Sequence, residues 1–147
     1  MTGAKQVGLL HPGQMGVSIG AAAQRGGNTV WWASDGRGAA TRTRAEQAGL
    51  RDAGSLAQLC ATCDVILSVC PPHAAEDVAR QVAETSFGGL YVDANAIEPQ
   101  RARQIGAIVG AAGAACVDGG IVGGPAWKPG TSLYLSGERA AEVAELF

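Results

Sequence analysis

Charged and aromatic residues are scarce in this sequence, and histidine occurs only twice. Of the 147 residues, 16% are charged and 5% are aromatic, and the formal net charge is −2. This balance gives no general attraction for nucleic acid or for an anionic membrane. The sequence also lacks a charged-then-apolar leader and an apolar run long enough to cross a bilayer. We therefore expect a cytoplasmic protein with no nucleic-acid partner and no membrane partner.

Metal ligands are equally few. The four cysteines include Cys60 and Cys63, whose spacing is found in redox motifs and in zinc sites. A zinc site needs two further ligands, and the only histidines, His11 and His73, lie in other predicted turns. A chain of this size without a secretion signal usually keeps its thiols reduced. The sequence therefore predicts free thiols and no metal site.

The sequence is rich in apolar residues, at 47%, and in glycine, at 22 residues. Apolar runs alternate with segments typical of helices, which predicts an α/β fold with a mainly parallel sheet. Strands are predicted at residues 6–10, 29–32, 64–69, 90–93, 115–117 and 132–135. Helices are predicted at residues 14–25, 39–48, 56–60, 74–84, 99–111 and 138–147. Because such helices cover both faces of the sheet, we expect one doubly wound domain.

The first predicted strand leads directly into a glycine-containing turn within residues 7–16. In a dinucleotide-binding turn, glycines allow a sharp bend and a close approach to a pyrophosphate, and the following helix supplies free N–H groups. Gly13 and Gly16 stand where the second and third glycines belong, whereas His11 replaces the first. The turn must therefore differ, or tolerate a side chain near the pyrophosphate. An ordinary strand-to-helix turn is the alternative interpretation of so short a motif.

Unusual residues follow several of the predicted strands. They lie at residues 11–13, 34–37, 70–73, 95 and 118–120. The carboxyl ends of parallel strands meet at one edge of a sheet, and α/β sheets bind their ligands there. We therefore expect these residues to share one rim of the fold.

The residues after the second predicted strand bear on the choice between NAD and NADP. NAD-binding turns place a carboxylate about twenty residues after the glycines, whereas NADP-binding turns avoid it and use an arginine. Asp35 would repel a 2′-phosphate if it faced the pocket; if it faced solvent, Ser34 and Arg37 could hold that phosphate. We expect NADP, with NAD as the alternative. A solvated helix face is the other interpretation of Arg37, Arg42 and Arg44.

Three segments occur in the order and spacing of a known superfamily. Residues 7–16 resemble its opening G-x-G-x-M-G motif, residues 92–95 its V-D-x-S/T segment, and residues 118–124 its D-x-P-V-S-G-G segment. Residues 132–137 are similar to a segment of the imine reductases. Over nearly all of its length, the chain thus resembles the nucleotide-binding domain of the β-hydroxyacid dehydrogenase, 6-phosphogluconate dehydrogenase and imine reductase superfamily. The resemblance implies a Rossmann-type fold.

The resemblance also implies an oxidoreductase that transfers hydride between NAD(P) and a small alcohol, carbonyl or imine substrate. Residues 1–147 would be its NAD(P)-binding domain, without the helical C-terminal domain that completes the site and drives homodimerisation in the family. The family's catalytic lysine lies beyond Phe147, so no catalytic residue is assigned in this chain, and the domain alone is expected to be inactive. A non-enzymatic NAD(P)-binding sensor or structural module is the alternative, because fold alone does not determine function.

The predicted cofactor contacts come from the turns after four of the predicted strands. They are His11, Pro12, Gly13, Gln14, Met15, Ser34, Arg37, Cys70, Pro71, Pro72 and Asn95, and the predicted substrate contacts are Asn95, Val122, Gly123 and Gly124. Relatives usually have Ser or Thr at the position of Asn95, and many hydroxyacid dehydrogenases have a substrate-binding serine at that of Val122. The Asn95 amide can bond a ligand, or its own backbone as an ordinary turn residue. Val122 suits a less polar substrate.

Overall fold

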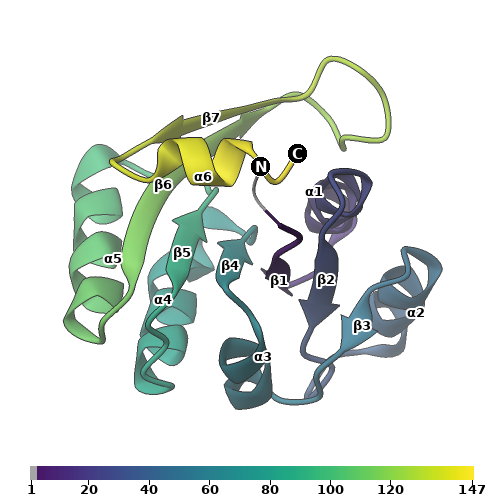
Figure 1. Cartoon of the computed structure of the whole chain (residues 1–147), viewed down its shortest axis with the longest axis horizontal. Helices are drawn as coiled ribbons and strands as arrows, with labels where there is room; N and C mark the ends of the chain where they lie inside the picture. The colour runs from purple at the N-terminus through teal and green to yellow at the C-terminus, as the bar shows by residue number, and fades with distance from the viewer. Residues whose placement is uncertain (1–2) are drawn as a thin grey trace.

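The computed structural model describes residues 3–147. Its strands are β1 (Gln6–Leu10), β2 (Thr29–Trp32), β3 (Arg51–Asp52), β4 (Val65–Ser68), β5 (Leu90–Asp93), β6 (Ala115–Val122) and β7 (Ser132–Ser136). They form one sheet in the order β3–β2–β1–β4–β5–β6–β7 (Figure 1). Neighbouring strands are parallel, except that β7 is antiparallel to β6. The mainly parallel sheet predicted from the sequence is therefore confirmed.

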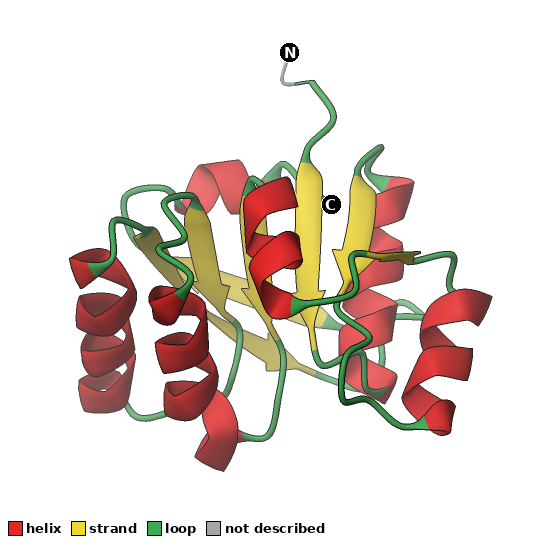
Figure 2. Ribbon diagram, turned by 90° about the horizontal axis from the view of Figure 1, so that it is seen from below, coloured by secondary structure: helices red, strands yellow, loops and turns green. Residues whose placement is uncertain are grey.

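Helices connect the strands and lie both in front of and behind the sheet (Figure 2). They are α1 (Gln14–Arg25), α2 (Ala39–Gln47), α3 (Leu56–Thr62), the 3₁₀ helix η1 (Pro72–Ala74), α4 (Ala75–Glu84), α5 (Pro99–Ala111) and α6 (Ala140–Ala144). One buried cluster joins the sheet to α1, α2 and α6, and a second joins its other face to α3, α4 and α5. The predicted doubly wound Rossmann-type fold is confirmed. Within residues 3–147, no helix has both the length and the apolar character needed to cross a membrane.

Successive residues of the central strands face opposite cores. Val7 and Leu9 belong to the cluster beneath α1, whereas Leu10, Ile66 and Tyr91 belong to the cluster beneath α3, α4 and α5. All five side chains are buried. A strand that is buried on both faces needs apolar residues at every position. This requirement explains why the strands stand out in the sequence as continuous apolar runs.

Small residues allow α1 to lie close against the sheet. A Cβ atom on Gly20 of α1 would lie 3.1 Å from Leu9 Cδ2. In β1, a Cβ atom on Gly8 would lie only 2.6 Å from Ile66 Cδ1 on the opposite face. Both glycines therefore stand where larger side chains would push the layers apart. This close packing holds α1 against one face of β1 and α3 against the other.

Two strands differ from the sequence prediction. β6 extends to Val122 instead of ending at residue 117, because β7 pairs with it from Asp118↔Ser136 to Val122↔Ser132. The prediction that residues 118–120 follow this strand is therefore wrong, because they lie within it, although Asp118 does lie level with the last residue of β5. The sequence did not indicate β3, whose two residues pair with the end of β2. A strand of two residues is too short to produce a recognisable periodicity.

Candidate functional site

The turn between β1 and α1 keeps a glycine-like backbone although it contains His11. His11 has a φ angle of +57°, in the left-handed region. Glycine adopts this region without steric cost, and histidine is one of the few other residues enriched there. The N–H of Gly13 donates a hydrogen bond of 2.6 Å to the carbonyl oxygen of His11. The turn therefore accommodates His11 at the position of the missing first glycine through a left-handed backbone conformation.

Helix α1 begins with N–H groups that no side chain caps. Its N-cap residue is Gly13, which has no side chain to accept from the first turn. A Cβ atom on Gly13 would meet only the His11 carbonyl oxygen, at 3.9 Å, whereas one on Gly16 would lie 3.0 Å from the same atom. The space before Gly13 is thus open, and Gly16 is enclosed. Free N–H groups, the positive end of the helix dipole and this open space fit a pyrophosphate.

The open turn lies at the point where the strand order reverses direction. β1 has β2 on one side and β4 on the other, so the connections lead away from a crevice between β1 and β4. A Cβ atom on Gly16 would lie 3.6 Å from Val69 Cβ, which places the segment after β4 against the start of α1. Doubly wound folds bind their ligands at such a switch point. The candidate site is therefore this crevice.

A hollow of about 180 Å³ lies beside the turn. Its walls are formed by Leu9, Leu10, His11, Ala33, Asp35, Arg37, Leu56, Val78 and Gln81. Burial, and then the positive charge of Arg37, lower the pKa of His11, so its imidazole is neutral at pH 7. The residues from α3 and α4 (Leu56, Val78 and Gln81) were not predicted. Their one signal in the sequence, the helical spacing of Val78 and Gln81, is too general to select them.

Arg37 and Asp35 both line this hollow, whereas Ser34 does not. Asp35 therefore borders the pocket, which is the case in which its charge opposes a 2′-phosphate, and of the two expected phosphate ligands Arg37 is the one beside the hollow. Ser34 is buried, and its backbone N–H donates to Asp52 Oδ1 at 3.3 Å. Desolvation raises the pKa of Asp52, but hydrogen bonds from Ser34 and Gly54 outweigh this effect and leave the pKa lowered. Asp52 therefore carries a negative charge behind the turn, and Ser34 faces that carboxylate. A contact between Ser34 and a cofactor stays a prediction.

The arginines of α2 do not form a uniform solvated face. Arg44 donates a hydrogen bond of 3.1 Å to the carbonyl oxygen of Pro12, inside the turn before α1. Arg42 instead lies 3.8 Å from the Asp52 carboxylate and 5.9 Å from the centre of the Trp32 ring. The interpretation of these arginines as a solvated face is therefore wrong for Arg44. Arg44 braces the turn and brings a positive charge close to it.

Asn95 crosslinks the ends of β4 and β5. Its side chain is buried, its Oδ1 accepts from the N–H of Cys70 at 2.7 Å, and its Nδ2 donates to Ser68 Oγ at 3.1 Å. The backbone N–H of Asn95 donates to Asp93 Oδ1 at 2.9 Å. Both ends of the amide are therefore engaged with other residues of the rim. Asn95 holds the segment that contains Cys70, Pro71 and Pro72 in place.

The predicted substrate residues do not lie together. Asn95 and Asp118 line a shallow hollow of about 280 Å³ between the end of β5 and the β6–β7 pair. Val122 stands four residues further along β6, roughly 13 Å away at the usual rise of a strand, and its side chain is 59% exposed. Gly123 follows in the left-handed region, and a Cβ atom there would lie 2.9 Å from the Gly130 carbonyl oxygen. Gly123 is therefore needed to close the turn between β6 and β7, whereas a Cβ atom on Gly124 would meet no described atom within 4 Å.

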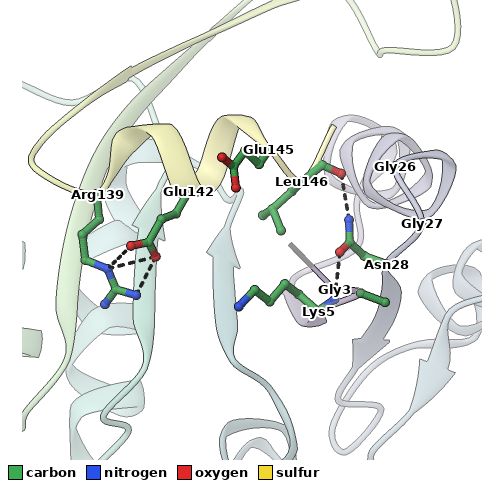
Figure 3. A pocket seen from close by; sticks show the side chains of 10 residues that line it. Gly3, Lys5, Gly26, Gly27, Asn28, Arg139, Glu142, Glu145 and Leu146 are labelled. Atoms are coloured by element: carbon green, nitrogen blue, oxygen red, sulfur yellow. Dashed lines mark hydrogen bonds and ion pairs between the residues drawn. The ribbon is translucent and has the colours of Figure 1, made fainter. Parts of the chain in front are cut away.

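A larger hollow, of about 730 Å³, lies at the opposite end of the sheet, beside the amino end of β1 (Figure 3). Arg139 and Glu142 pair with each other there, with 2.6 Å between Nη2 and Oε2. Asn28 Nδ2 donates to the Leu146 carbonyl oxygen at 2.8 Å, which ties the segment after α6 to the end of α1. These polar groups bond one another. The hollow lies beside the C-terminal end of α1, away from the free N–H groups at the start of that helix. Size alone does not make this hollow the ligand site.

The thiols of Cys60, in α3, and Cys63, at its C-terminal end, are buried in the cluster between this helix and the sheet. Burial raises the pKa of both, that of Cys63 to about 12. Nucleophilic and metal-binding thiols need the opposite shift. Within residues 3–147, no group of three or more His, Cys, Asp or Glu side chains could hold a metal ion.

Fold and site together define a dinucleotide-binding domain of the Rossmann class. Residues 6–145 match the family described as the NAD binding domain of 6-phosphogluconate dehydrogenase, and the chain belongs to this family. The family resemblance predicted from the sequence is therefore confirmed, and with it the capacity for NAD(P) as the cofactor class. The comparisons offer no support for a non-enzymatic module. A comparison with curated proteins finds no match.

Solved structures show the same fold. A conserved protein of unknown function, reported as structurally similar to 3-hydroxyacid dehydrogenases, superposes with a TM-score of 0.85 at 26% identity over 96% of this chain and 53% of its own. The 3-hydroxyisobutyrate dehydrogenase of Mycobacterium tuberculosis superposes with a TM-score of 0.83 at 20% identity, over 96% of this chain and 50% of its own. A reductive aminase of Aspergillus terreus superposes with a TM-score of 0.77 at 21% identity, over 99% of this chain and 51% of its own. The chain spans about half the length of these structures.

Proposed function

We propose that this chain is the cofactor-binding part of an oxidoreductase that transfers hydride between NAD(P) and a small alcohol, carbonyl or imine. The observation that carries the proposal is the uncapped N-terminus of α1 at the switch point, with open space before Gly13. The family match supports the cofactor class. The reductive aminase with the same fold was solved with an NADPH derivative, cyclohexanone and allyl amine, which supports the substrate class.

The chain's own residues hold and orient the cofactor. We assign the pyrophosphate to the N–H groups of Gln14 and Met15, and the adenosine to the hollow that His11 and Arg37 line. The nicotinamide, which supplies or accepts the hydride, is assigned to the side of the crevice formed by residues 70–72. Asn95 serves this side indirectly, because its amide bonds Cys70 and Ser68. We assign Val122, Gly123 and Gly124 to apolar contact with the substrate.

We place the group that moves the substrate proton outside these 147 residues, in a further helical domain of the complete protein. The purified 147-residue chain is therefore expected to bind NADPH without oxidising it when cyclohexanone and allyl amine are added. NADPH binding is followed by fluorescence and its oxidation by absorbance. Steady-state loss of NADPH in the presence of the chain, but not in its absence, would show that these 147 residues catalyse the reaction on their own and would contradict this assignment.

We propose NADP as the preferred cofactor, with Arg37 as the residue that holds the 2′-phosphate. Arg37 lines the hollow and is close enough to lower the pKa of His11. An arginine that bonds a phosphate contributes roughly 1.5–3 kcal/mol, so Arg37→Ala should weaken NADPH binding at least about tenfold. NADH binding should stay within about twofold. Asp35→Asn should tighten NADPH binding, because it removes a negative charge from the same hollow.

Dissociation constants for NADPH and NADH in wild type and each variant test this preference. Arg42→Ala is the matched control, because Arg42 pairs with Asp52 and does not line the hollow. The preference is wrong if NADH binds wild type at least as tightly as NADPH does and Arg37→Ala leaves NADPH binding unchanged.

A further inference from the structure

The turn that connects β6 and β7 is a long, mostly exposed loop, in which Ala126 packs against the buried cluster beneath α1. Residues 123–131 are exposed apart from Ala126 and Thr131, and Trp127 is 56% exposed. Thr131 Oγ1 donates to the Gly124 carbonyl oxygen at 2.6 Å, a bond within the loop itself. The loop begins with the glycines assigned above to the substrate. Its position therefore decides where one wall of the substrate site stands.

One buried hydroxyl joins this loop to the cofactor helix. Within the part of the chain that the structure describes, the only hydrogen bond from the loop to another element runs from the N–H of Ala126 to Ser18 Oγ, at 2.8 Å. The same hydroxyl donates to the carbonyl oxygen of Met15 at 2.7 Å. Ser18 is 0% exposed. A hydroxyl donates one proton. Because Ser18 donates that proton to Met15, the lone pairs of Ser18 Oγ are oriented to accept from Ala126.

The acceptor, Met15, belongs to the first turn of α1, where the pyrophosphate is assigned. The bond from Ser18 to Met15 spans three residues, so it exists only while this turn is helical. First turns fray easily when their N–H groups lack partners. A ligand that binds the N–H groups of Gln14 and Met15 holds the turn, and with it the rotamer of Ser18. The anchor of the loop therefore depends on the state of the cofactor site.

We propose that Ser18 is a positioning residue that couples NAD(P) binding to the order of the loop at residues 123–131. This inference rests on the proposed function for its ligand. Cofactor bound at the start of α1 stabilises the bond between Ser18 and Met15, which keeps Ser18 Oγ aimed at Ala126. The substrate-side wall is therefore better ordered when the cofactor is bound.

Amide hydrogen exchange at Ala126 measures this anchor directly. In wild type without cofactor, the Ala126 amide should exchange about tenfold more slowly than in Ser18→Ala, since one hydrogen bond contributes roughly 1–1.5 kcal/mol. Saturating NADPH should slow exchange at Ala126 further in wild type and leave it unchanged in Ser18→Ala. Ser18→Thr keeps the hydroxyl and should restore both effects.

Ser55→Ala is the matched control, because Ser55 Oγ accepts a hydrogen bond at the start of α3 and lies away from the loop. It should lower stability while leaving the exchange of Ala126 unchanged. Equal exchange of Ala126 in wild type and Ser18→Ala would overturn the anchor. If NADPH binds wild type but does not slow Ala126, the coupling is wrong and the proposed function stands. If NADPH does not bind wild type at all, the proposed function fails, and the coupling fails with it.

Discussion

Gly13→Glu is expected to abolish NADPH binding, with a loss of affinity of at least about a hundredfold, or roughly 2.7 kcal/mol. The nearest described atom to a Cβ at this position is the His11 carbonyl oxygen, at 3.9 Å, so a side chain fits the folded protein. It would occupy the space assigned to the pyrophosphate, and its carboxylate would repel the phosphates. Its charge would also bind the free N–H groups of α1 in place of the ligand. Titration calorimetry with NADPH measures the loss.

Gly110→Glu controls for the added charge. Gly110 lies in α5, and a Cβ atom there would meet nothing within 4 Å among the described residues. Its affinity for NADPH should equal that of wild type, and both variants should melt cooperatively. If Gly13→Glu folds and binds NADPH with wild-type affinity, the N-terminus of α1 is not part of the cofactor site.

Asp93→Asn is expected to stabilise the protein at neutral pH. Asp93 is 1% exposed; its Oδ1 accepts from the N–H of Asn95, and its Oδ2 has no partner among the described residues. It lies in register with Ser68 on β4 and with Asp118 on β6. Burial, with a further contribution from the Asp118 carboxylate, raises the pKa of Asp93 to about 6. The folded state thus favours the protonated form of this carboxyl.

The direction of the pH dependence follows from this shift. The folded pKa of about 6 lies above the ordinary value of 3.8, so the folded state binds the proton more tightly than the unfolded state does. The stabilisation from this group is complete below pH 3.8 and is lost as the pH rises through 6. From below pH 3.8 to above pH 6, this group lowers the free energy of unfolding by about 3 kcal/mol. An asparagine keeps the acceptor for the Asn95 N–H and carries no charge to desolvate.

Urea unfolding between about pH 4 and pH 8 tests this prediction in wild type and in Asp93→Asn. The free-energy gain of the variant should be small near pH 4 and grow as the pH rises through 6. Asp77→Asn, on the exposed first turn of α4, controls for the loss of one carboxylate. A gain that does not change with pH, or a variant that is less stable than wild type at pH 8, would show that Asp93 is not buried as an unfavourable charge.

Local sequence was sufficient for most of the secondary structure. The run of Val7, Leu9 and Leu10 predicted β1, because a doubly covered strand must be apolar at every position. Gly13 and Gly16 predicted the turn and the start of α1, because the first glycine leaves space for a pyrophosphate and the second allows the helix to pack close to the strand. These patterns also carried the family resemblance, which the match over residues 6–145 confirms.

Long-range contacts were not readable in the same way. Nothing near Asn95 in the sequence indicates that its amide bonds Cys70 and Ser68, which lie 25 and 27 residues earlier. Similarly, the bond between Ser18 and Ala126 joins residues that are 108 positions apart. The length of β6 was missed for a related reason, because glycines weaken a strand unless a neighbour such as β7 pairs with it.

The sequence by itself thus determined the order of the helices and of every strand except β3, the glycine turn and the class of cofactor, because each depends on residues close together in the chain. Only the tertiary structure decided which side chains complete the site. It placed Leu56, Val78 and Gln81 beside His11, and it turned Arg44 toward Pro12. The physical reason is that side chains meet through the packing of helices on the sheet, and a single sequence does not specify which distant partner each polar group will find.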